Sequence, residues 1–172
     1  MLTNKAKAGG VYKVVCHDAD GNFKWEETTH NLVVNQGLQD MNTKYFAGSS
    51  YTAAWYLGLI TGPGSGTTIA AADTLASHAG WTEFTNYSGN RKAVTFGTAT
   101  TADPSVIDNS GSPSQFTISG AGGVVAGAFL CNAASGTSGV LFSASDFQSP
   151  GDRTVVSGDT LTVTYTFSLD AA

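Results

Sequence analysis

Residues 160–169, near the end of the chain, constrain the fold more than any other stretch. Large apolar residues alternate there with threonine and serine, and the apolar positions are Leu161, Val163, Tyr165, Phe167 and Leu169. Because successive side chains of a strand point to opposite faces of a sheet, this alternation predicts a strand with one face in the core. The threonine face is then either solvated or in contact with a partner, and the sequence leaves both interpretations open.

Short strand-like runs separated by turn residues recur along the whole chain. The chain contains 21 glycines and only 12% charged residues, a composition that is typical of all-β proteins. We therefore expect a mainly β fold, an antiparallel β-sandwich of the jelly-roll or immunoglobulin-like type, with one short helix. A length of 172 residues suits a single domain of this kind.

The N-terminal part of the sequence predicts an arm followed by a β-hairpin. Residues 1–10 lack the apolar core of a signal peptide, and we expect a flexible basic arm there. Strand-like runs at 11–17 and 22–28 flank an Asp-Gly step, and glycine accepts the positive φ of a tight turn. The expected organisation is an arm over residues 1–10 and one sandwich domain over residues 11–172, which includes a hairpin over residues 11–28.

Two segments indicate helical structure. Over residues 35–46 apolar side chains recur at helical spacing, Asn35 can cap the first turn, and Gly48 can end the helix; the apolar positions are Leu38, Met41 and Tyr45. Residues 73–80 predict a second, shorter helical turn that Asp73 would cap. We expect the first helix to pack on the end or side of the sandwich.

The remaining segments predict strands and one long loop. The apolar run at residues 53–60 is too short for a typical helix and predicts a central strand. Residues 124–131 and 140–145 predict a hairpin. The polar stretch over residues 98–114 predicts a long loop with a brief strand at residues 105–107.

The charge pattern limits the classes of partner. A net charge of −5 argues against nucleic-acid binding, which needs clustered lysine and arginine. No apolar run is long enough to cross a bilayer, so we expect no membrane partner. Lys5, Lys7 and Lys13 precede every acidic residue. This basic start can either dock on an acidic neighbour or remain a solvated terminus.

No catalytic or metal-ligating pattern stands out. His17, His30 and His78 are scattered, and neither HExxH nor GxSxG occurs. We expect no enzymatic activity, no metal site and no cofactor. Cys16 and Cys131 lie in separate strand-like runs, which favours two buried free thiols; a disulfide requires that their backbones come close.

Several segments carry a resemblance to a known class of proteins. They are HNLVVNQGLQDM, WYLGLI, DTLASHAGWTEFTNYSGNRKAVTF, GAFLCNAASGTSGVLFSASDF and RTVVSGDTLTVTYTFSL. Together, from about residue 30 onward, they resemble small virion proteins of tailed bacteriophages, of the head decoration (cement) type. The resemblance implies a homotrimer or homodimer, made in the host cytoplasm, that binds the major capsid protein on the capsid surface and stabilises contacts between capsid subunits.

Two places are the expected contacts with the capsid: the basic arm and the long polar loop. Their candidate residues are Lys5, Lys7, Lys13, Asp103 and Asp108.

Two other functions stay open. One is a tail, neck or fibre-attachment role in the virion. The other is a carbohydrate-binding module, in which aromatic side chains stack on sugar rings; the candidates are Trp25, Trp81, Tyr87, Tyr51 and Trp55.

Overall fold

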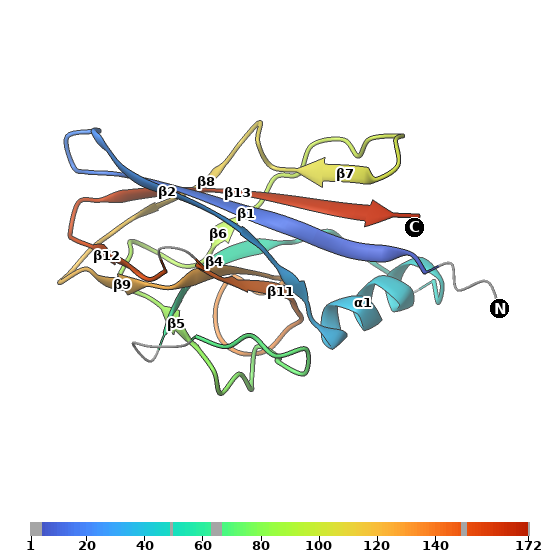
Figure 1. The fold of residues 1–172 in the computed structure, drawn as a ribbon. Coiled ribbons are helices and arrows are strands. Elements are labelled where there is room, and N and C mark those ends of the chain that lie inside the picture. Colours follow the sequence, from blue (N-terminus) through green and yellow to red (C-terminus); the bar gives the residue numbers. More distant parts are fainter. Residues whose placement is uncertain (1–4, 49, 63–66, 149–150, 172) are drawn as a thin grey trace.

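Two antiparallel sheets face each other in the computed structural model, which describes residues 5–48, 50–62, 67–148 and 151–171 (Figure 1). Sheet A has the strand order β2 (Phe23–His30), β1 (Lys7–His17), β13 (Thr160–Asp170) and β7 (Ser105–Asp108), and β8 (Ser114–Thr117) also pairs with β13. Sheet B has the order β3 (Leu32–Val33), β11 (Leu141–Asp146), β10 (Gly127–Cys131), β4 (Tyr56–Thr61) and β5 (Thr82–Phe84), and β6 (Lys92–Ala93) also pairs with β4. A small ribbon joins β9 (Gly123–Val125) to β12 (Arg153–Val155). The expected mainly β sandwich is confirmed.

Strand β13 is the strand that the alternating pattern predicted, and it lies between β1 and β7 in sheet A. Leu161, Val163 and Tyr165 are fully buried between the sheets. Leu169 is 40% exposed, so the apolar face of the strand leaves the core before the strand ends. The threonine side chains of the opposite face are half-buried.

Residues 7–10 of the expected N-terminal arm form part of a strand, and residues 1–4 lie outside the described residues. Strand β1 begins at Lys7, which lies opposite Asp170 of β13, so residues 7–10 belong to sheet A. The length of β13 explains the difference, because it supplies hydrogen-bonding partners beyond the hairpin. The hairpin itself is confirmed: Asp18 Oδ1 accepts hydrogen bonds from the backbone N–H groups of Asp20 (2.9 Å) and Asn22 (2.8 Å), and Gly21 has a φ of 85°.

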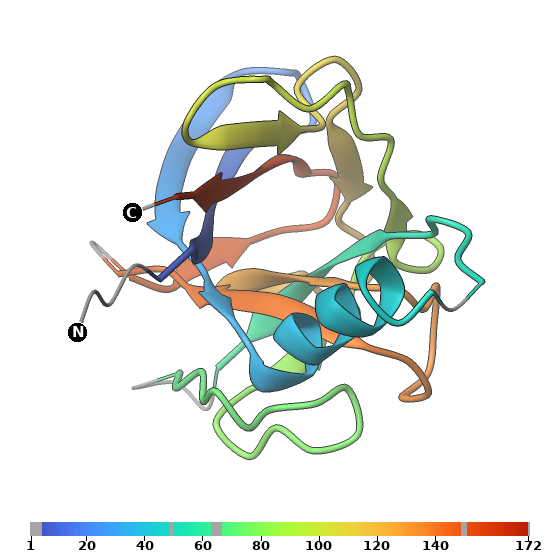
Figure 2. The same ribbon diagram turned by 90° about the vertical axis from the view of Figure 1, so that its right-hand side faces the viewer.

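Helix α1 (Asn35–Tyr45) confirms the first helical prediction, and it lies against β11 at one end of the sandwich (Figure 2). Its N-cap is Val34, without a side-chain cap, and not Asn35 as expected. The N–H group of Asn35 donates instead to the carbonyl oxygen of Ala71 (2.8 Å). A partner that is distant in the sequence therefore satisfies this end of the helix.

Residues 73–80 form turns and not the expected helical turn. The carboxylate of Asp73 accepts hydrogen bonds from the backbone N–H of Ala70 and from Trp81 Nε1, both at 3.0 Å. The side chain thus holds a loop together, and it does not cap a helix.

The middle strands of sheet B, β11, β10 and β4, are buried on both faces, which explains the continuous apolar run that precedes residue 61. One cluster fills the space between the sheets and includes Leu57 and Leu59 of β4. The other covers the outer face of sheet B, where Ile60 packs with Trp81 and Phe129. A strand buried on both faces does not need to alternate in polarity.

Both cysteines are buried and free, as expected. Cys16 belongs to the cluster between the sheets, whereas Cys131 belongs to the cluster on the outer face of sheet B. Burial is the main reason why the thiol pKa of Cys16 rises to about 11 and that of Cys131 also rises.

Candidate functional site

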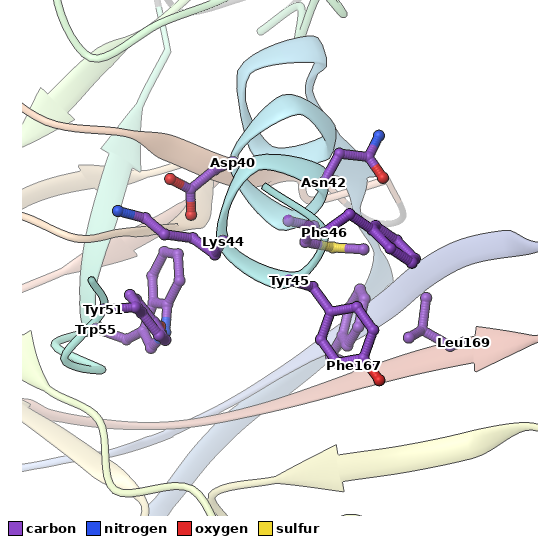
Figure 3. Close-up of a pocket in the computed structure, with 10 residues that line it drawn as sticks. Asp40, Asn42, Lys44, Tyr45, Phe46, Tyr51, Trp55, Phe167 and Leu169 are labelled. Carbon is purple, nitrogen blue, oxygen red and sulfur yellow. The ribbon is translucent and has the colours of Figure 1, made fainter. Parts of the chain in front are cut away.

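An apolar groove opens between the C-terminal end of α1 and the C-terminal half of β13 (Figure 3). Its volume is about 480 Å³, which lies in the range of ligand pockets. The lining residues are Asp40, Met41, Asn42, Lys44, Tyr45, Phe46, Tyr51, Trp55, Phe167 and Leu169. We call these residues the aromatic groove. Aromatic rings form most of its walls, and the charged groups come from α1.

The packing of α1 explains why the groove stays open. Gly37 is the buried residue of the helix, and a Cβ at this position would clash with the carbonyl oxygen of Phe142 in β11. The helix therefore contacts sheet B through its first turn. Further along, Leu38 remains 40% exposed and Tyr45 81% exposed. The apolar stripe of α1 is thus only partly covered by its own sandwich.

One wall of the groove is a pair of hydrogen-bonded rings. Trp55 Nε1 donates to the hydroxyl oxygen of Tyr51 at 2.7 Å, and the Trp55 ring packs edge-on against Phe142 with 5.3 Å between the ring centroids. Lys44 Nζ lies 5.4 Å from the centroid of the Tyr51 ring, a cation–π distance. Partial burial raises the pKa of Tyr51. These contacts hold the wall in one arrangement.

The opposite wall protrudes from the surface. Tyr45 and Phe46 are 81% and 79% exposed, and their rings meet edge-on at a centroid distance of 4.9 Å. Large apolar side chains that cluster at the surface mark interaction sites more often than single exposed ones do. A smaller cavity of about 200 Å³ continues from the groove into the core, and Met41, Trp55 and Phe167 line both.

Charged residues from both ends of the chain lie close to the groove. In the pairing of β1 with β13, the backbone of Lys7 lies opposite that of Asp170. The backbone N–H of Ala171 donates to Asp103 Oδ1 at 3.1 Å. Lys7 and Asp170 also line a polar cavity of about 390 Å³. We call Lys5, Lys7, Asp103 and Asp170 the charged end. Figure 1 shows that the start of β1, the end of β13 and α1 share this end of the molecule.

The predicted contact residues are therefore only partly brought together. Lys7 and Asp103 lie at the charged end, and the exposed Lys5 lies two residues before β1 begins. Lys13 lies further along β1, where its Nζ is 3.0 Å from Glu26 Oε2. Asp108 caps a turn by accepting the N–H of Ser110 at 2.8 Å, and this hydrogen bonding lowers its pKa.

Of the aromatic residues proposed to stack on sugars, Trp81 and Tyr87 are buried in the core and cannot stack on a ligand. Trp25 is half-buried, and Arg153 Cζ lies 5.6 Å from the centroid of its ring. Tyr51 and Trp55 do line the groove.

The exposure of the pair Tyr45 and Phe46 was not predicted from the sequence. A weak signal exists, because Tyr45 is the last residue of α1 and Phe46 follows it, where the helical spacing of the apolar face ends.

The described residues contain no group of three or more His, Cys, Asp and Glu side chains that could hold a metal ion. Among them there is also no helix long and apolar enough to span a membrane.

No family model, curated protein or solved structure matches the chain. The aromatic groove is an open apolar recess beside two exposed aromatic rings.

Proposed function

We propose that the chain is a structural protein of a tailed-phage virion that binds the outside of the capsid and stabilises contacts between major capsid subunits. The segments from about residue 30 onward, which resemble head decoration proteins, support this role. The structural observation that carries it is the concentration of contact features at one end of the sandwich. The charged end and the aromatic groove lie there side by side.

A rigid sandwich with one distinct end suits a protein that covers a seam. Sheet A holds Lys7 and Asp170 in place through the full-length pairing of β1 with β13, so this part of the charged end is fixed relative to the core. A protein that binds the assembled shell but not its dissociated subunits shifts the assembly equilibrium toward the shell. Repetition of the contact around the symmetry axes of the shell adds avidity.

The charged end offers groups of both signs within a small area. Lys5 and Lys7 are exposed, as is Asp103. Mixed charges at the rim of an interface set its orientation and raise its association rate more than its affinity. We propose that this end of the molecule contacts the capsid, and that its lysines form ion pairs with acidic groups of the capsid protein.

The first test is quantitative mass spectrometry of purified virions of the phage that encodes the chain. A copy number equal to that of the major capsid protein, or to a simple fraction set by the symmetry axes, supports decoration. A few copies to a few dozen per particle would assign the chain to the tail, neck or fibre attachment, and absence from the virion would overturn the virion role.

A second test addresses the surface itself. Capsids that lack the chain are mixed with purified variants, and bound protein is measured by co-sedimentation. Reversal of the charge in Lys5→Glu/Lys7→Glu should weaken binding at least tenfold at low salt. Lys13→Glu, further along β1, is the matched control and should bind like the wild type. Equal binding by all three proteins would remove the charged end from the proposal.

Carbohydrate binding is the second candidate, because Tyr51 and Trp55 line the groove. Sugar hydroxyl groups need hydrogen-bonding partners when they are buried. The groove walls are mostly aromatic carbon, which favours an apolar protein ligand over a sugar. A glycan array that shows binding by the wild type and none by Trp55→Ala would favour a sugar over a protein ligand in the groove.

A further inference from the structure

We propose that the exposed face of α1 and the aromatic groove beside it form a two-fold interface with a second copy of this chain. This goes beyond the capsid assignment, which uses the charged end, and it concerns the purified protein without a capsid. The starting observation is that α1 is amphipathic but buries its apolar side chains only in part within its own chain, where Met41 packs against the core. Leu38, Tyr45 and Phe46 stay exposed beside an open groove.

The surface is self-complementary in shape. A two-fold interface uses the same patch on both subunits, so each patch must supply both a protrusion and a recess. Tyr45 and Phe46 protrude at one side of the patch. The recess next to them is lined by Trp55 and Phe167 (Figure 3). Two copies related by a two-fold axis can each insert the aromatic pair into the groove of the other.

The charges of α1 are also self-complementary. Asp40 and Lys44 lie one helical turn apart, and both line the groove. When two copies of the helix pack antiparallel across a two-fold axis, Asp40 of each copy faces Lys44 of the other. This arrangement produces two equivalent ion pairs. Because each chain carries a net charge of −5, such local pairing also offsets the repulsion between copies.

The size of the patch suits a moderate interface. An aromatic side chain buries about 150–250 Å², so the exposed parts of Tyr45, Phe46 and Tyr51 supply several hundred Å² per copy. Standard interfaces bury about 800 Å² per partner. We therefore expect a reversible dimer with a dissociation constant on the order of micromolar. On a capsid, such a dimer would present two charged ends at once and gain avidity.

Sedimentation velocity of the full chain over a wide concentration range tests the proposal. We expect a monomer–dimer equilibrium in the wild type. Phe46→Ser should weaken dimerisation at least tenfold, and its thermal midpoint should stay near that of the wild type because the ring is exposed. Phe23→Ser is the matched control: Phe23 is 63% exposed, but it starts β2 beside the hairpin at the opposite end of the molecule (Figure 1).

Charge reversal tests the two-fold geometry. Asp40→Lys and Lys44→Asp should each weaken dimerisation, since each places like charges opposite one another. The double variant Asp40→Lys/Lys44→Asp restores opposite charges across the axis and should recover most of the affinity. Recovery is not expected if the groove only binds an unrelated partner.

Three results would overturn the interface. One is a wild type that stays monomeric at concentrations of several hundred micromolar. Another is a loss in Phe23→Ser as large as in Phe46→Ser, and the third is a double reversal no better than the single ones. If the wild type is monomeric while Phe46→Ser loses capsid binding, the groove belongs to the capsid contact, and the proposed virion function survives without the dimer.

Discussion

The hydroxyl oxygen of Tyr12 in sheet A lies 2.7 Å from the hydroxyl oxygen of Ser143 in sheet B. The Ser143 hydroxyl also donates to the hydroxyl oxygen of Tyr165 at 3.3 Å, and Asn31 Nδ2 donates to that same oxygen at 2.9 Å. Tyr12, Ser143 and Tyr165 are fully buried. Burial raises the pKa of both tyrosines. A polar network therefore ties the two sheets together through an otherwise apolar core.

Removal of the serine hydroxyl should destabilise the protein. In Ser143→Ala both tyrosine hydroxyls lose one buried partner, although Tyr12 still donates to the backbone carbonyl oxygen of residue 143 (3.1 Å) and Tyr165 still accepts from Asn31. Loss of a hydrogen bond costs about 0.5–1.5 kcal/mol. We expect the free energy of unfolding in urea to fall by about that amount. Ser138→Ala, at an exposed loop position, should leave it unchanged. If both variants unfold at the wild-type urea concentration, the network contributes nothing to stability.

A buried arginine should be essential to the loop that follows β10. Arg91 donates to both carboxylate oxygens of Glu83 (2.8 and 2.7 Å) and to the carbonyl oxygens of Ala133 (3.0 Å) and Gly136 (2.9 Å). Its side chain is 4% exposed. Arg91→Met removes the donor from these acceptors. The free energy of unfolding should fall by about 3 kcal/mol, because breakage of a buried ion pair costs roughly 3–5 kcal/mol.

The control for Arg91→Met is Lys13→Met in the exposed pair with Glu26. Lys13→Met should lower the free energy of unfolding by less than about 1 kcal/mol. Chemical denaturation of both variants gives the comparison. Equal losses would mean that burial of the Arg91 pair has no bearing on its contribution.

The close approach of α1 to sheet B should depend on glycine. A Cβ in Gly37→Ala would meet the carbonyl oxygen of Phe142, so the helix must shift outward. Alanine favours an isolated helix by about 1 kcal/mol over glycine, but overpacking costs about 1–3 kcal/mol. We expect net destabilisation in thermal melts. Gly9→Ala, where a Cβ meets nothing within 4 Å, is the control and should be neutral or slightly stabilising. A stabilised Gly37→Ala protein would contradict the packing described.

Asp146 should make stability depend on pH. Burial, followed by the charge of Asp152, raises the pKa of Asp146 to about 6, whereas an aspartate in an unfolded chain has a pKa of about 3.9. The folded state therefore holds this proton more tightly. The stabilisation that the folded state gains from protonated Asp146 is fully present below about pH 4 and is lost as the pH rises through about 6.

Asp146→Asn should consequently stabilise the protein at pH 8 relative to the wild type, and less or not at all at pH 4. The gain should be below about 1 kcal/mol, since the carboxyl group is partly exposed and solvent screens it. Urea denaturation at both pH values measures the difference. A gain of the same size at pH 4 and pH 8 would show that titration of Asp146 is not its cause.

Local patterns in the sequence predicted the elements whose geometry depends on their own residues. The alternation along β13 and the spacing of Leu38, Met41 and Tyr45 in α1 both found their elements. Two of the predictions that failed concerned partners distant in sequence: residues 7–10 pair with the far end of β13, and the N–H group of Asn35 donates to Ala71. The third failed within its own segment, because the carboxylate of Asp73 accepts a hydrogen bond from Trp81, eight residues away. No local pattern records which segment will be opposite another.

The candidate site shows the same division. Lys7 and Asp103 were singled out from the sequence, but only the pairing of β1 with β13 and the contact of Asp103 with Ala171 bring them to one end. Tyr51 and Trp55 were singled out as well, and the structure adds the groove that they line.

The sequence by itself determined that this chain is a β-sandwich with one amphipathic helix, because the polarity of successive residues fixes which faces seek the core. The tertiary structure decided how much of that helix the core accepts. Gly37 brings the first turn against Phe142, and the helix then runs past the covered region, so Tyr45 and Phe46 remain outside. Periodicity states that a side chain is apolar and on a given face, whereas burial depends on what the rest of the chain places against that face.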